Sequence, residues 1–113
     1  MECIFCKIVQ GEVPCTVVYE DEYVIGFEDI YPSATNHIIV IPKLHVEDLN
    51  GLNDSNIDYV KHVFLAITKI VKALKIDQTG YRVVNNCGAH AFQSVKHIHF
   101  HIVGGQELTP TFC

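Results

Sequence analysis

The sequence predicts an α+β fold in which a five-stranded, mostly antiparallel sheet is covered by one long helix and a short N-terminal helix. Three observations predict this class: five short runs rich in β-branched residues, one long segment with apolar residues at every third or fourth position, and short connections between them. At 113 residues, 49% of them hydrophobic, the chain has the length of one domain, so residues 1–113 are expected to form a single domain.

The first elements are expected in the N-terminal third of the chain. A short helical segment is expected at residues 3–10. Residues 16–19 and 23–27 are β-rich and flank an acidic trio, which is the spacing of a β-hairpin. A third strand is expected at residues 37–41 and ends at Pro42, because proline has no N–H to donate to a neighbouring strand.

Residues 53–75 predict the long helix. Its apolar residues recur at helical spacing, and the positions that define the pattern are Ile57, Val60, Phe64, Ile67, Val71 and Leu74. Asn53, Asp54 and Ser55 are the expected capping residues. The apolar positions cover about 200° of the helix surface, roughly twice what contact with one sheet face requires. A second buried surface, a dimer contact, is therefore expected on this helix.

Two further strands are expected at residues 81–85 and 97–103. The loop between them holds Asn86, Gly88, Gln93 and Ser94. The last eight residues are expected to form an extended tail.

Composition disfavours several classes of function. The net charge is −5 and the 8 Lys and Arg residues are dispersed along the chain, so a nucleic-acid partner is not expected. No segment resembles a signal peptide or approaches the ~20 apolar residues of a membrane span, so a cytoplasmic location without membrane contact is predicted. Five cysteines predict reduced thiols, available to a metal site, rather than a disulfide framework.

Residues 97–102, His-Ile-His-Phe-His-Ile, carry the main functional signal. On a strand this alternation places His97, His99 and His101 on one face. His97 and His101 are then about 13 Å apart, too far for all three rings to bind one metal ion readily. A neutral imidazole is a nucleophile near pH 7 and a protonated one binds phosphate. The alternative is a strand whose histidines have no function. The presence of three histidines on the same face disfavours it.

This string, followed by Gly104-Gly105, resembles the signature of the histidine triad (HIT) family, His-X-His-X-His-X-X, and the chain is most similar to the Hint-like branch. The resemblance spans nearly all 113 residues. The other matching segments are residues 4–8 with Pro14, 27–30 with Pro32, His37 with 40–43 and His45, 80–82 with Asn86, and 93–95. The resemblance implies the HIT-like fold and a homodimer joined into one continuous sheet.

In this family the middle histidine of the signature attacks the α-phosphorus of a nucleotide derivative. The resemblance therefore implies that His99 is the nucleophile. The implied reaction is the hydrolysis of nucleoside phosphoramidates, or related nucleoside monophosphate derivatives, through a nucleotidyl-histidine intermediate. By the same resemblance His101 holds the phosphate oxygens, His37 supports the histidine cluster, and Ser94 contacts the phosphate or the leaving group.

The resemblance also implies a purine nucleotide-binding site. Gln93, like Ser94, is expected to contact the phosphate or the leaving group, and Asn86 to bind the phosphate region. Val95, from the same segment, is also assigned to the nucleotide-binding site. Asp29 is the expected ribose ligand, because a carboxylate accepts both hydroxyl protons. An apolar slot for the base is expected from Phe5, Ile8, Phe27 and Ile30. Core packing explains each of these four residues equally well when it is taken alone.

Cys3 and Cys6 form a Cys-X-X-Cys pair, whose spacing lets two thiolates bind one zinc ion. The resemblance to bacterial members of the family implies that His45 and His97 complete the site. Such a Cys2His2 set has no open position, so the expected zinc is structural rather than catalytic. A redox pair and two unrelated core cysteines are the alternatives.

Two departures from the family pattern leave the leaving group open: Phe92 stands where a small glycine is expected, and Gln106 where arginine is common. Two other functions are also open. One is a metal-dependent hydrolase or oxygenase that uses His97 and His99 as a His-X-His metal pair. The other is a regulatory module that binds nucleotides without turnover. The sequence identifies neither the base nor the leaving group.

Overall fold

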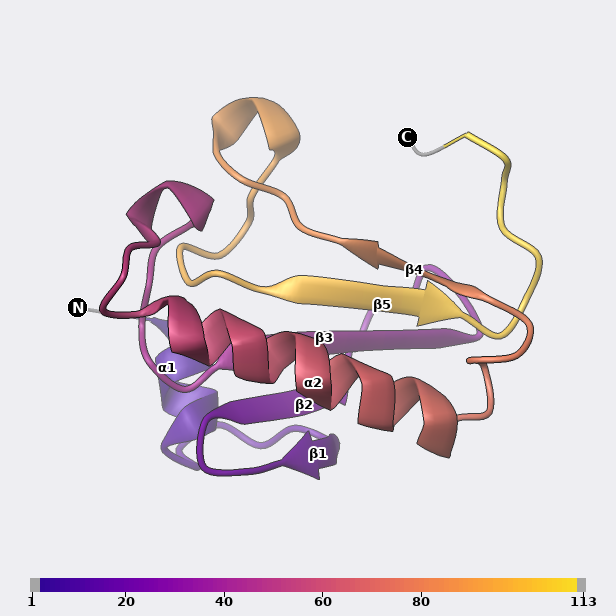
Figure 1. Cartoon of the computed structure of the whole chain (residues 1–113), viewed down its shortest axis with the longest axis horizontal. Coiled ribbons are helices and arrows are strands. Elements are labelled where there is room, and N and C mark those ends of the chain that lie inside the picture. The colour runs from indigo at the N-terminus through magenta and orange to yellow at the C-terminus, as the bar shows by residue number, and fades with distance from the viewer. Residues whose placement is uncertain (1–2, 112–113) are drawn as a thin grey trace.

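The computed structural model describes residues 3–111 and contains one five-stranded sheet with a helix on each face (Figure 1). The elements are α1 (Ile4–Val9), β1 (Val17–Glu20), β2 (Val24–Glu28), β3 (Asn36–Pro42), η1 (Leu49–Gly51), α2 (Ile57–Ala73), β4 (Tyr81–Val84), η2 (Ala89–Ala91) and β5 (Phe100–Gly104), where η marks a short 3-10 helix. The predicted α+β class is confirmed. Residues 112 and 113 of the predicted tail lie outside the described part of the chain.

All neighbouring strands are antiparallel, and their order is β1-β2-β3-β5-β4. The β1–β2 hairpin forms where the acidic trio predicts it. Oδ1 of Asp21 accepts hydrogen bonds from the backbone N–H groups of Tyr23 and Val24, at 2.8 and 2.9 Å, and so fixes the turn. Within the described residues β4 pairs with β5 alone, so its other edge is open.

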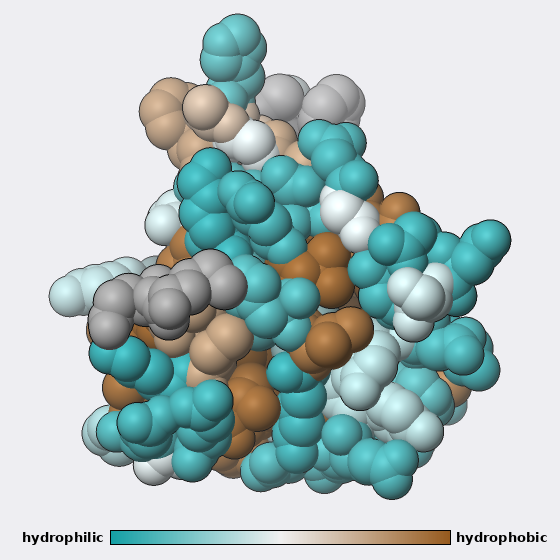
Figure 2. Space-filling view, turned by 90° about the vertical axis from the view of Figure 1, so that its left-hand side faces the viewer, coloured by the Kyte–Doolittle hydropathy of each residue, from teal (hydrophilic) through white to brown (hydrophobic). Residues whose placement is uncertain are grey.

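The sheet separates two apolar clusters. The larger lies between the sheet and α2, which crosses β1, β2 and β3, and the smaller lies between the sheet and α1. Since β2 and β3 are buried on both faces, their sequences are nearly continuous apolar runs rather than alternating ones. Seen from the N-terminal side, the remaining exposed apolar surface is divided by hydrophilic side chains (Figure 2). No described helix has the length and apolar character needed to cross a membrane.

Helix α2 begins later than its predicted caps. Its N-cap is Asn56, whose side chain makes no capping hydrogen bond. The prediction of Asn53, Asp54 or Ser55 as caps is wrong because these residues form a separate turn. In that turn Oδ1 of Asn53 accepts from the backbone N–H of Ser55 at 2.9 Å, and Oδ1 of Asn56 accepts from the N–H of Asn53 at 2.8 Å.

Strand β5 is also shorter than predicted, since its ladder begins at Phe100 and not at residue 97. The residues before Phe100 are held by other bonds. The N–H of Ile98 donates to the carbonyl oxygen of Val46 at 2.7 Å, and Nδ2 of Asn85 donates to the carbonyl oxygen of His99 at 2.8 Å. The predicted alternation nevertheless holds, because Ile98 and Phe100 belong to the cluster under α2.

Candidate functional site

The three histidines of the signature lie on the sheet face opposite α2. His97 and His99 are buried, with 0% and 3% of their surfaces exposed, and His101 is half-buried. The rings of His99 and His101 are in contact, with centroids 5.2 Å apart. The ring of Phe5 from α1 meets the ring of His99 edge-on at a centroid distance of 5.2 Å. The histidine row therefore faces α1, and His99 is held between Phe5 and His101.

The proton of a neutral His99 ring is placed by a backbone carbonyl. Nδ1 of His99 lies 2.9 Å from the carbonyl oxygen of His97. A carbonyl only accepts hydrogen bonds, so Nδ1 must carry the proton and donate it. Nε2 of the neutral His99 ring then keeps its lone pair, which is the form that a nucleophile requires.

A second chain of hydrogen bonds fixes His37 and His101. The backbone N–H of Ser33 donates to Nδ1 of His37 at 2.9 Å, so a neutral His37 carries its proton on Nε2. Nε2 of His37 lies 2.8 Å from Nδ1 of His101, to which it donates. The remaining proton of a neutral His101 is then on Nε2. This order leaves His101 with one N–H group to offer to an anion.

Burial, followed by the neighbouring His99 and His37, lowers the pKa of His101 to about 4, with Asp29 acting in the opposite direction. His101 is therefore neutral at pH 7, as its hydrogen bond from His37 also requires. Oδ2 of Asp29 lies 3.4 Å from Nε2 of His37. Asp29, His37 and His101 are close enough to be considered as metal ligands. However, the proton on Nε2 of His37 occupies the position that a metal would need.

The predicted metal ligands Cys3, Cys6, His45 and His97 do come together, with one ligand atom of each within 4.8 Å of all the others. Sγ of Cys3 is 3.5 Å and Sγ of Cys6 is 3.6 Å from Nδ1 of His97. Nδ1 of His45 is 3.3 Å from Sγ of Cys6 and 3.2 Å from Nδ1 of His97. A zinc tetrahedron with Zn–S of about 2.3 Å and Zn–N of about 2.05 Å has edges of about 3.3–3.8 Å. The cluster fits a tetrahedral zinc ion.

The surroundings of the cluster favour a cation as well. Nε2 of His97 donates to the carbonyl oxygen of Pro42 at 2.9 Å, so the lone pair of Nδ1 points into the cluster. Burial, together with the adjacent Cys3, raises the pKa of the Cys6 thiol to about 11. Without a cation the thiolate of Cys6 is unfavourable at pH 7, whereas a bound metal ion stabilises it.

The loop between β4 and β5 carries the predicted residues Gln93, Ser94 and Val95, which differ in burial and in hydrogen bonding. Both ends of the Gln93 amide bind backbone: Oε1 accepts from the N–H of Gly88 at 2.9 Å, and Nε2 donates to the carbonyl oxygens of Glu47 and Val95 at 2.8 and 3.0 Å. Ser94 is exposed, whereas Val95 packs against the cluster under α1. Gln93 therefore fixes the loop that carries Ser94.

Asn85 is a site residue that the sequence did not identify. It holds the carbonyl oxygen of His99, and its own Oδ1 is buried with no hydrogen-bond partner among residues 3–111. The neighbouring Asn86, which was predicted to bind phosphate, is half-buried. An asparagine at the end of a strand is too common to point to this role, and only its position beside His99 reveals it.

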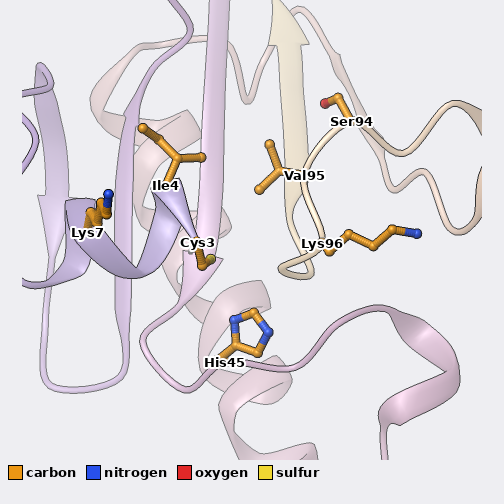
Figure 3. Close-up of a pocket in the computed structure, with 7 residues that line it drawn as sticks. All are labelled: Cys3, Ile4, Lys7, His45, Ser94, Val95 and Lys96. Atoms are coloured by element: carbon orange, nitrogen blue, oxygen red, sulfur yellow. The ribbon is translucent and has the colours of Figure 1, made fainter. Parts of the chain in front are cut away.

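The expected base slot is only partly assembled. Phe5, Ile8 and Phe27 are buried together under α1, while Ile30 is 81% exposed. Asp29 and His37 border a shallow hollow of about 160 Å³. A larger hollow of about 460 Å³ lies at the other end of the histidine row and is lined by Cys3, Ile4, Lys7, His45, Ser94, Val95 and Lys96. In it Ile4 from α1 and Val95 lie on opposite sides, with Cys3 and His45 at one end (Figure 3).

The alternative His-X-His metal pair has no geometric support. Nδ1 of His97 faces the cysteine cluster, whereas Nδ1 of His99 binds a backbone carbonyl. Among the described residues, no group of three or more candidate metal ligands includes His99.

Comparison with known proteins connects this geometry to a family. Residues 2–111 match the family model described as scavenger mRNA decapping enzyme C-terminal binding. The chain is 36% identical to the purine nucleoside phosphoramidase of Escherichia coli, over 96% of this chain and 92% of that protein. It is 45% identical to a HIT-like protein of Methanocaldococcus jannaschii, over 93% and 80% of the two chains.

Solved structures give the same result. A histidine triad protein from Clostridium difficile is 49% identical, with a TM-score of 0.94 over 98% of this chain and 96% of that one. A HIT family hydrolase from Clostridium thermocellum is 40% identical, with a TM-score of 0.96 over 99% and 97%.

The lowered pKa of His101 predicts a pH dependence of stability. Between about pH 6.5 and pH 4 the unfolded chain binds a proton at His101 that the folded chain does not, so the free energy of unfolding falls as the pH is lowered. Because the ring is half-buried, we expect about 1–2 kcal/mol from this residue. Urea unfolding at pH 7 and pH 4.5 should show a smaller loss in His101→Asn than in the wild type. An equal loss in both chains would contradict the assignment.

Proposed function

The chain belongs to the histidine triad family of hydrolases, and from this premise we propose that it hydrolyses purine nucleoside phosphoramidates, or related nucleoside monophosphate derivatives, through a nucleotidyl-histidine. One observation carries the proposal. The hydrogen bond from Nδ1 of His99 to the carbonyl of His97 leaves Nε2 of a buried imidazole with a free lone pair. The activity of the similar E. coli phosphoramidase supports the same reaction class.

In the proposed first step, the lone pair on Nε2 of His99 attacks the α-phosphorus and the bond from phosphorus to the leaving amine breaks. The amine takes up one proton from solvent and departs, and the water that attacks in the second step returns one proton to solvent. The phosphorylated imidazole carries a positive charge, which the carbonyl oxygen of His97 stabilises through Nδ1–H. In the second step water attacks phosphorus, the bond to Nε2 breaks, and the nucleoside monophosphate is released.

The remaining residues bind and orient the substrate. The N–H on Nε2 of His101 donates to a phosphate oxygen, and His37 keeps that proton in place through its bond to Nδ1 of His101. Ser94 binds the phosphate or the departing amine, and Asn86 the phosphate region. Asp29 accepts the ribose hydroxyls, and Phe5, Ile8, Phe27 and Ile30 provide the apolar surface for the base.

His99→Ala tests the nucleophile. We expect kcat for adenosine 5′-phosphoramidate to fall at least about a thousandfold, because the covalent route is removed, while the nucleotide still binds. Steady-state hydrolysis and calorimetric titration with AMP measure the two effects. The control is His62→Ala on α2, whose ring stacks on Tyr23 outside the histidine row.

The outcomes separate the rival functions. If the wild type binds AMP without hydrolysing any phosphoramidate, the regulatory nucleotide-binding module replaces the proposed enzyme. If His99→Ala keeps wild-type turnover, the nucleophile assignment is wrong.

We also propose that Cys3, Cys6, His45 and His97 hold one structural zinc ion. The ion crosslinks α1, the segment after β3 and the segment before β5, and it supplies no open position for substrate. The fit of the four ligand atoms to a tetrahedron supports this proposal.

Cys6→Ser tests the zinc site, and Cys15→Ser is the matched control at another half-buried cysteine. We expect about one zinc per chain in the wild type and in Cys15→Ser, and a loss of zinc with a lower unfolding temperature in Cys6→Ser. Elemental analysis and thermal denaturation measure both. A chain that stays folded after chelation but loses all activity would instead favour a catalytic metal.

The same premise leads us to propose a homodimer. Phe64 of α2 contacts Phe100 of β5, yet 49% of its surface is exposed, and β4, the strand next to β5, has an open outer edge in the described part of the chain. An exposed apolar side chain on this side of the sheet, together with an open strand edge, is a suitable surface for a second copy.

Phe64→Lys should therefore convert a dimer into a folded monomer, because a charge would be buried in the contact. Val17→Lys, at a similarly exposed position on the opposite edge strand β1, should leave the dimer intact. Sedimentation velocity measures the association, and circular dichroism verifies folding. A wild type that sediments as a monomer would refute the proposal.

A further inference from the structure

Phe92 has an unusual conformation. It ends η2 with φ 57° and ψ 44°, in the left-handed region that suits glycine and is unfavourable for a bulky side chain. Its ring is also 87% exposed. Both features oppose the presence of phenylalanine here, so a role outside the packing of the described chain is the natural explanation.

The loop does not allow Phe92 to relax. Its N–H donates to the carbonyl oxygen of Ala89 at 3.0 Å, and the N–H of Gln93 donates to that of Gly88 at 3.1 Å. The side chain of Gln93 ties the same loop to Glu47 and Val95. The ring is therefore presented from a fixed backbone.

This backbone borders the larger hollow. Gln93 attaches the loop to Val95, which lines the hollow, and Ser94, another lining residue, follows only two positions after Phe92. Two residues of chain span at most about 7 Å, so the backbone of Phe92 lies within that distance of the lining residue Ser94, although Phe92 does not itself line the hollow. Ile4, with 46% of its surface exposed, provides apolar surface there.

Ser94 connects this hollow to the leaving group. In-line attack at phosphorus places the departing amine on the side opposite Nε2 of His99. The proposed function assigns Ser94 to the phosphate or the departing amine, and Ser94 lines the hollow together with Cys3 and His45. The hollow lies at the His97 end of the histidine row, away from Asp29, to which the ribose is assigned.

We propose that Phe92 is a specificity-determining residue that contacts the leaving group and selects amines with an apolar, preferably aromatic, substituent. This inference rests on the proposed hydrolysis of phosphoramidates. An aromatic substituent can stack on the exposed ring, whereas a small amine cannot.

The test compares adenosine 5′-phosphoramidates whose nitrogen carries a phenethyl or an ethyl group. The measured quantity is the ratio of the two kcat/KM values, which cancels effects common to both substrates. We expect this ratio to fall about three- to tenfold in Phe92→Gly and Phe92→Ala and to persist in Phe92→Tyr. Thermal denaturation verifies folding, and Phe92→Gly should melt at a higher temperature than Phe92→Ala because it relieves the backbone strain.

An unchanged ratio in Phe92→Gly would overturn the proposal. So would a change from dimer to monomer in Phe92→Gly, which would make Phe92 a subunit contact. The contact between Phe92 and the leaving group is also tested without turnover, by the ratio of the dissociation constants of the two compounds. These constants are measured on His99→Ala with and without the Phe92 substitutions. A wild type that hydrolyses neither compound contradicts the proposed function, whereas a binding ratio that depends on Phe92 still supports its role.

Discussion

The hydrogen bond from Nδ1 of His99 to the carbonyl oxygen of His97 connects the two halves of the site. The ring of His97 belongs to the cysteine and histidine cluster, and its backbone selects the tautomer of the neighbouring histidine. The position of that carbonyl depends in turn on the bond from the His97 ring to Pro42 and on the ligand cluster. The proposed structural zinc ion would thus influence the proposed chemistry without touching the substrate, because it would hold the peptide group that orients His99.

Burial supplies the second constraint. A histidine row exposed to water would be partly protonated near pH 7, and its rings would repel one another. Here burial lowers the pKa of both His97 and His101 to about 4, so both rings are neutral. Each ring then has one nitrogen that donates a hydrogen bond and one that accepts. The chain from Ser33 through His37 to His101 is consistent only with that protonation state.

The sequence predicts those parts of the site that depend on local periodicity. Alternation from His97 to Ile102 correctly places three histidines on one face, because side-chain direction along an extended chain depends only on parity. The convergence of Cys3, Cys6, His45 and His97 required the family resemblance, since contacts between residues that far apart in sequence are fixed by topology. The caps of α2 were missed because the polar side chains of Asn53 and Asn56 bind backbone groups of the preceding turn instead. The role of Asn85 was missed because only its position beside His99 reveals it.

Gln106 shows how a departure from the family pattern is accommodated. Its Oε1 accepts hydrogen bonds from the backbone N–H and the hydroxyl of Thr35, at 2.6 and 2.8 Å. Arginine, the residue common at this position, has only donors and cannot make either bond. Thr35 lies in the same loop as Ser33, whose N–H sets the tautomer of His37. The substitution therefore changes how this loop is held while the order of protons along His37 and His101 is preserved. At Phe92, in contrast, the backbone has a conformation suited to glycine, so the phenylalanine changes the side chain that the loop presents to a ligand.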